Sequence, residues 1–177
     1  MDLTRILLRK SVSFAAVSAA AALLALPASA QAPRGKAELA VSGGAITVDY
    51  GQPSLKGRDM LSQLEEGAFW RMGMNQATVL ETPVDLDFGG TKVAKGSYSL
   101  WLKKQGEAFV LVFNSQTGQW GTQHDPAKDV HSVTLESEAL ASPVETFTIE
   151  LSKATGGGTL SLSWGATKLT GAFKIGM

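Results

Sequence analysis

The chain has 177 residues, of which 16 are lysine or arginine, 16 are aspartate or glutamate, and none is cysteine. The absence of cysteine excludes thiol nucleophiles, zinc–thiolate sites, iron–sulfur clusters and disulfides. A balanced charge without a basic cluster also argues against binding to nucleic acid.

The N-terminal segment, residues 1–30, has the features of a secretory signal peptide. A basic start precedes an apolar run over residues 12–26, and Ala28-Ser29-Ala30 then supplies the small-x-small motif that signal peptidase recognises. The run is shorter than the ~20 apolar residues of a membrane-spanning helix. We therefore expect cleavage after Ala30, no membrane anchor in the cleaved product, and a periplasmic or secreted location.

The remainder, residues 31–177, has the size of one domain of about 150 residues. Residues 31–36 are polar and are expected to form a flexible lead, so the predicted domain comprises residues 37–177. At this length, folding buries about 68–70% of the surface of the unfolded chain, which is enough for an independent core.

Apolar residues alternate with polar ones through the first half of this domain, as they do in half-buried strands. Residues 38–50 read as two short strands around Gly43-Gly44, a dipeptide that suits a tight hairpin. Residues 84–90 alternate and turn at Gly89-Gly90, and residues 97–104 form the next strand. Residues 107–114 are the most continuously apolar run and predict a central strand.

Strands also dominate the second half of the domain. They are expected over residues 130–135, 145–152, 159–164 and 167–175, with three glycines at 156–158 between the second and the third. Residues 59–66 read instead as one short helical turn segment. Nine or ten strands at this spacing predict an all-β fold, a single-domain antiparallel β-sandwich.

Five segments occur in the order of a known family: ITVDYGQPSLKGR, WRMGMNQAT, VAKGSYSLW, QTGQWGT and VETFTIEL. Over residues 46–164 the sequence resembles the domain-of-unknown-function family 2911, a family of exported bacterial proteins. The resemblance implies an exported β-rich domain and supplies no activity, substrate or cofactor. The chain departs from the family pattern at Gln76, where glutamate is frequent, and a glutamine cannot act as a general base or an anionic metal ligand.

Residues 70–79, WRMGMNQATV, contain the first candidate site. Arg71 offers five donors in a planar fork, and Asn75 tolerates left-handed backbone angles. The favoured interpretation is a structural corner in which Trp70 packs on the core while Arg71 and Asn75 satisfy buried backbone groups. The other interpretation is an anion-binding pocket, whose ligand contacts would be Trp70, Arg71, Asn75 and Trp120.

The second candidate site is the long loop over residues 114–132, which contains both histidines. A loop of this length in a compact domain is more often functional than not. Extended backbone would place Asp129 and His131 on one face, and together with His124 they could chelate a metal ion. The favoured interpretation is nevertheless two solvated loop histidines near acidic residues, because two histidines are a weak metal signal.

Other catalytic motifs are missing from the sequence. It contains no G-x-S-x-G elbow, no phosphate-binding loop and no dinucleotide fingerprint. The paired carboxylates Asp85 and Asp87, and likewise Glu136 and Glu138, alternate within predicted strands and are interpreted as solvent-facing.

We therefore predict an exported β-sandwich protein without catalytic activity and without a cofactor, which binds a ligand or has a structural or interaction role. Its partner would be an unknown small molecule or protein. The alternative prediction is a hydrolase or a metal-dependent enzyme that uses the loop containing His124 and His131.

Overall fold

The computed structural model describes residues 33–176, which are mostly β-strand. The strands are β1 (Arg34–Val41), β2 (Gly44–Gly51), β3 (Phe69–Trp70), β4 (Thr78–Thr82), β5 (Leu86–Phe88), β6 (Thr91–Val93), β7 (Gly96–Gln105), β8 (Ala108–Asn114), β9 (Asp129–Ala154) and β10 (Gly157–Ile175). A short 3-10 helix, η1 (Pro126–Lys128), precedes β9. None of the helical structure in residues 33–176 is long and apolar enough to cross a membrane. The predicted signal peptide and its cleavage site after Ala30 lie outside the described residues.

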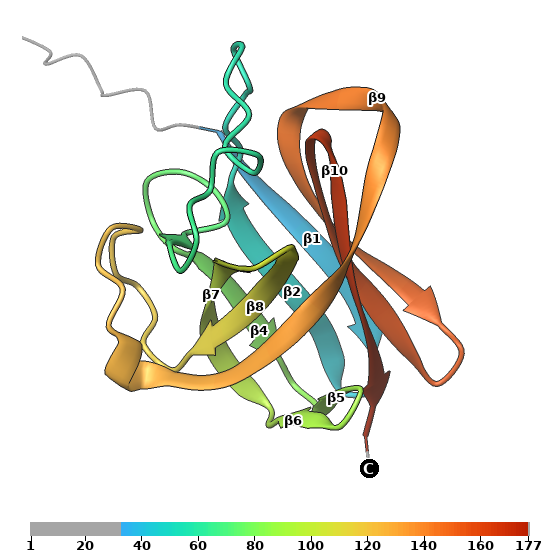
Figure 1. The fold of residues 1–177 in the computed structure, drawn as a ribbon. Helices are drawn as coiled ribbons and strands as arrows, with labels where there is room; N and C mark the ends of the chain where they lie inside the picture. Colours follow the sequence, from blue (N-terminus) through green and yellow to red (C-terminus); the bar gives the residue numbers. More distant parts are fainter. Residues whose placement is uncertain (1–32, 177) are drawn as a thin grey trace, which may run out of the picture. The chain divides into compact units, whose positions relative to one another are not determined.

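The strands form one 10-stranded antiparallel sheet in the order β1-β2-β4-β7-β8-β9-β10-β5-β6, and β3 pairs with β7 outside this path. The predicted central strand is β8, which pairs with β7 on one side and with β9 on the other (Figure 1). The predicted all-β antiparallel class and strand number are thus confirmed.

The last two strands are much longer than predicted, because four predicted segments merge into β9 and β10. Residues 140–143 of β9 lie opposite a single residue of β10, Ala166, where the register shifts. Such bulges bend a strand without ending it. The first part of β9 pairs with β8 and the later part pairs with β10, so β9 connects the two halves of the sheet.

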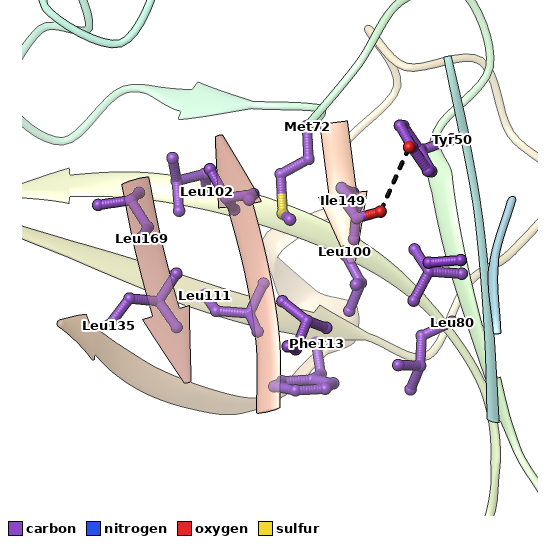
Figure 2. Close-up of a cluster of buried hydrophobic side chains, with 14 of the residues drawn as sticks. Tyr50, Met72, Leu80, Leu100, Leu102, Leu111, Phe113, Leu135, Ile149 and Leu169 are labelled. Atoms are coloured by element: carbon purple, nitrogen blue, oxygen red, sulfur yellow. Dashed lines mark hydrogen bonds between the residues drawn. The ribbon is translucent and has the colours of Figure 1, made fainter. Parts of the chain in front are cut away.

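Apolar faces of both halves of the sheet pack into one main core. Leu111 and Phe113 of β8 are buried in the same cluster as Leu160 and Leu162 of β10. Figure 2 shows side chains from several strands meeting there, among them Leu111, Phe113 and Leu169. Since successive residues of a strand point to opposite faces, the residues between these on β8 face away from the main core.

The segment that follows β2 also reaches β9. Residues 53–55 exchange two backbone hydrogen bonds with residues 145–147 of β9, each 2.9 Å long. The hydroxyl of Tyr50 donates to the carbonyl oxygen of Ile149 at 3.3 Å (Figure 2). These bonds fix the end of β2 against the bent part of β9.

Two predicted boundaries differ from the structure. β1 begins at Arg34, within the predicted flexible lead, because the Arg34 guanidinium donates to Asp49 of β2. Residues 59–66 form turns rather than a helix, with a single helical-type bond from the N–H of Gln63 to the carbonyl of Asp59. The Asp59 carboxylate accepts the N–H groups of Leu61 and Ser62, as an N-cap residue does, but the chain leaves the helical path after Gln63.

Candidate functional site

The loop over residues 71–76 lies directly on the end of β2. A Cβ atom at Gly51 would lie 2.3 Å from the carbonyl oxygen of Met74 and 2.7 Å from its nitrogen. A Cβ atom at Gly73 would lie 2.9 Å from the carbonyl oxygen of Gly51. The two glycines therefore allow backbone to touch backbone, which any side chain would prevent.

Three residues of this loop have positive φ angles: 50° at Met72, 155° at Gly73 and 64° at Asn75. Such angles are uncommon outside glycine, and asparagine tolerates them better than methionine. Met72 is fully buried, and its carbonyl oxygen accepts the hydroxyl of Thr78 at 2.6 Å. Core packing and this hydrogen bond together hold the unfavourable Met72 angle.

Backbone hydrogen bonds join this loop to the start of the long loop between β8 and β9. The N–H of Gly121 donates to the carbonyl of Asn75 at 2.8 Å, and the N–H of Ala77 donates to the carbonyl of Gln119 at 3.2 Å. The pairing resembles a short stretch of antiparallel sheet, so the two loops form one unit.

The four predicted ligand residues differ in how deeply they are buried. Trp70 is only 8% exposed and stacks on Trp164, with ring centroids 5.3 Å apart and planes inclined by 10°. Arg71 and Asn75 are half-buried, and Nη1 of Arg71 donates to the Asn75 carbonyl at 3.4 Å. Trp120 is 48% exposed. Trp70 therefore packs in the core, as the corner interpretation requires, and Trp120 is the exposed ring.

The hydrogen bonds that hold the corner together differ from those predicted. The Asn75 carbonyl already accepts the shorter bond from Gly121, so Arg71 is a second and longer donor to the same oxygen. Asn75 contributes its left-handed backbone angle, while no side-chain hydrogen bond of Asn75 occurs within residues 33–176. Backbone pairing, rather than the Arg71 and Asn75 side chains, accounts for most of the closure.

A smaller apolar cluster lies on the face of the sheet that points away from the main core. We call it the outer cluster, and it consists of Ala77, Trp101, Val110, Val112 and the half-buried Phe69. The imidazole of His124 packs against it, with its ring centroid 4.2 Å from that of Phe69 and 4.6 Å from that of Trp101. The loop between β8 and β9 thus folds over one end of the outer cluster.

A polar network fixes His124 in this position. Its Nε2 atom lies 2.8 Å from Oδ1 of Asp129, and the same oxygen accepts Nδ2 of Asn114 at 2.8 Å. Asn114 is fully buried and also donates to the carbonyl of Asp125 at 2.9 Å. The pair of His124 and Asp129 therefore anchors the loop.

The third residue of the predicted metal set, His131, lies elsewhere. A register shift between Phe113 and Asn114 interrupts the alternation of β9, so Asp129 and His131 do not share a face. The His131 ring lies 6.5 Å from that of Phe113 and 6.4 Å from that of Tyr98. Within residues 33–176, no three His, Cys, Asp or Glu side chains are grouped so as to hold a metal ion.

A cavity of about 300 Å³ opens beside His131. Its lining residues come from β5, β6, the start of β9 and the end of the described chain: Asp85, Leu86, Asp87, Lys92, Val93, Ala94, His131 and Gly176. Leu86 and Val93 belong to the main core and are almost fully buried, so they border the cavity with little exposed surface. Its charged groups are two carboxylates and one ammonium.

Asp87, which lines this cavity, and Tyr98, which is bonded to the lining residue Ala94, have shifted pKa values. The N–H of Gly90 and then the ammonium of Lys92 hold the pKa of Asp87 below its ordinary value of 3.8. Burial and then the nearby charge of Asp85 raise the pKa of the Tyr98 hydroxyl, which donates to the carbonyl of Ala94 at 2.9 Å. At neutral pH the cavity is thus lined by an ionised Asp87, and a neutral Tyr98 hydroxyl is bonded to the lining residue Ala94.

No pattern in the sequence indicates this cavity. The interpretation of both Asp85 and Asp87 as solvent-facing holds for Asp85, which is exposed, whereas Asp87 is half-buried beside the cavity. Contact between residues 85–94, His131 and Gly176 depends on long-range strand pairing, which alternation does not reveal.

Comparison with known proteins identifies the family. The model of a family described as protein of unknown function (DUF2911) matches residues 32–173. The chain belongs to this DUF2911 family. The resemblance noted in the sequence is therefore confirmed, and no curated protein or solved structure matches the chain. Since the DUF2911 description names no activity, function has to be argued from the site itself.

The corner yields a test that uses Gly121. A Cβ atom at Gly121 would lie 2.2 Å from Cδ of Arg71 and 2.7 Å from the Asn75 carbonyl oxygen. We expect Gly121→Ala to lower the free energy of unfolding by about 1–3 kcal/mol, as overpacking does. In an Arg71→Ala background the cost should be smaller, because the closest atom is gone. Urea unfolding measures both costs, and equal costs would show that Arg71 does not pack on Gly121.

Proposed function

We propose that this chain is exported and acts as a non-catalytic binding domain for a small amphipathic molecule. The ligand would occupy the cavity beside His131. The observation that carries the proposal is a cavity of about 300 Å³ that reaches the core residues Leu86 and Val93 and has polar groups at its rim. Small-molecule sites are typically concave, mostly apolar and supplied with a few polar groups, at volumes of roughly 300–1,000 Å³.

The charges at the rim favour a neutral or cationic ligand. Asp87 pairs with Lys92 at 3.2 Å, so the two charges offset each other. Oδ1 of Asp85 accepts the N–H of Lys95 at 2.7 Å, which leaves Oδ2 available to a donor on the ligand. An apolar body would contact Leu86 and Val93, while a hydroxyl, amide or amine would face Asp85.

The state of Asp87 supports binding rather than proton transfer. Its pKa is lowered, and both of its oxygens accept hydrogen bonds, one from Gly90 at 2.6 Å and one from Lys92 at 3.2 Å. A general acid needs a pKa near the working pH, and a general base needs access to the substrate proton. Asp87 meets neither condition.

The alternative of a hydrolase or metal-dependent enzyme has less support. His124 and Asp129 form a close pair, but the His124 side chain is packed between aromatic rings and His131 lies near other rings. A catalytic metal site ordinarily uses three protein ligands. We therefore retain the binding function as the proposal.

Export is supported by the basic start, the apolar run and Ala28-Ser29-Ala30. We expect mass spectrometry of the exported protein to place its N-terminus at Gln31. Recovery of the protein from the soluble periplasmic fraction with Met1 intact would contradict cleavage.

Ligand binding is tested by thermal unfolding in the presence of small neutral compounds such as phenol, indole and cyclohexanol. A compound that binds the folded state raises the melting temperature by mass action. Ala94 lines the cavity and is exposed, so Ala94→Trp should obstruct the site without disturbing the core. We expect this variant to lose the stabilisation.

Ala141→Trp provides the matched control, because Ala141 is exposed and lies in the bulged part of β9. This variant should keep the ligand-induced stabilisation. If Ala94→Trp responds to the compounds as fully as the unmodified protein does, the cavity is not their binding site.

A further inference from the structure

The outer face of the sheet carries a second arrangement of side chains, which shares only His131 with the cavity described above. In the strand register, Phe69 of β3 lies opposite Lys103 of β7, which lies opposite Val110 of β8. The adjacent row on the same face places Val112 of β8 opposite Ser132 of β9. The two rows together present aromatic, cationic, apolar and hydroxyl side chains from four strands.

Only part of this face is covered. His124 and the rest of the loop between β8 and β9 lie over the end occupied by Trp101. The other end remains a groove of about 340 Å³, which we call the outer groove. Its lining residues are Phe69, Lys103, Gln105, Val110, Val112, Asp129, Val130, His131 and Ser132. Val130 at its border is 45% exposed, which is unusual for a large apolar side chain among residues 33–176.

The polar side chains of the outer groove differ in how many interaction partners they already have. The ammonium of Lys103 lies 5.4 Å from the centre of the Phe69 ring and forms no ion pair with any carboxylate of residues 33–176. The side chains of Gln105 and Ser132 likewise have no hydrogen-bond partner within that range. The carboxylate of Asp129 is different, because it is bound by His124 and Asn114 at the covered end.

This distribution gives the outer groove a polarity along β8. Lys103 stands beside Val110, whereas Asp129 stands opposite Asn114, four residues further along the strand. Four residues of a strand span about 13 Å. A negative group is therefore attracted to the Lys103 end and repelled from the Asp129 end, while the valine floor between them suits an apolar body.

From this arrangement we propose that the outer groove binds a small organic carboxylate. The carboxylate accepts hydrogen bonds from Lys103 and from the side-chain amide of Gln105, which lies on the same face two residues further along β7. The apolar part of the ligand covers Val110 and Val112 and meets the Phe69 ring. The site shares the lining residue His131 with the proposed cavity but otherwise uses different residues, and it does not require that cavity to be occupied.

Lys104 supplies a matched control for the charge of Lys103. The two lysines are neighbours on β7 and point to opposite faces, and each places its ammonium over a phenylalanine ring, Lys104 at 4.3 Å from Phe109. Lys104 does not line the outer groove. Replacing either by glutamine removes one charge and one cation–π contact, so only the groove contact distinguishes the two variants.

The experiment is an NMR titration of the isotope-labelled protein with benzoate and with benzamide, its uncharged analogue, at constant ionic strength. We expect benzoate to shift the amide signals of Lys103, Val110, Val112 and Ser132 with a dissociation constant on the order of 1 mM. Lys103→Gln should weaken benzoate binding by about two- to fivefold, as loss of a partly exposed ionic contact does, and Lys104→Gln should not change it.

Benzamide should bind more weakly than benzoate, because it carries no charge for Lys103. Shifts confined to other regions, equal affinity for benzoate and benzamide, or equal effects of Lys103→Gln and Lys104→Gln would each overturn the proposal. Because Ala94→Trp obstructs only the cavity beside His131, benzoate binding to the outer groove should persist in that variant. This separates a failure of one site from a failure of the other.

Discussion

The contact between Gly51 and the loop over residues 71–76 is the constraint on which the rest of the molecule depends. At Gly51 the backbone of β2 meets the backbone of Met74 so closely that no side chain fits between them. The loop must then adopt positive φ angles to turn over β2, and it carries Asn75 into position to pair with Gly121. One close contact thus positions both of the loops that the sequence presents as candidate sites.

This constraint separates structural residues from residues available to a ligand. Trp70 enters the main core because the chain turns over β2 immediately after β3, and His124 is packed on the outer cluster because its loop is fixed at Gly121. Side chains that do not take part in fixing these loops line two other places: the cavity beside His131 and the outer groove beside Lys103. Both proposed sites combine strand residues that no loop motif indicated with His131, at the end of the loop segment over residues 114–132.

Alternation of apolar and polar residues predicted most strands, because a half-buried strand enforces a period of two. It did not predict the length of β9, since residues 140–143 bulge out and interrupt the pattern. The corner was foreseen from a tryptophan followed by polar residues, but its closure by Gly121 depends on a contact distant in sequence. The separation of Asp129 from His131 follows from a register shift that pairing with β8 creates, and no local pattern reports it.

Amide hydrogen exchange of Gly51→Ala tests this central constraint most directly. Gly51 has no positive φ angle, so alanine is compatible with its backbone and any effect arises from the contact with Met74. The account predicts faster exchange at the amides of Ala77 and Gly121, by about tenfold for each 1.4 kcal/mol of lost local stability. Unchanged exchange at both amides would show that the loops are held independently of β2 and would contradict the account.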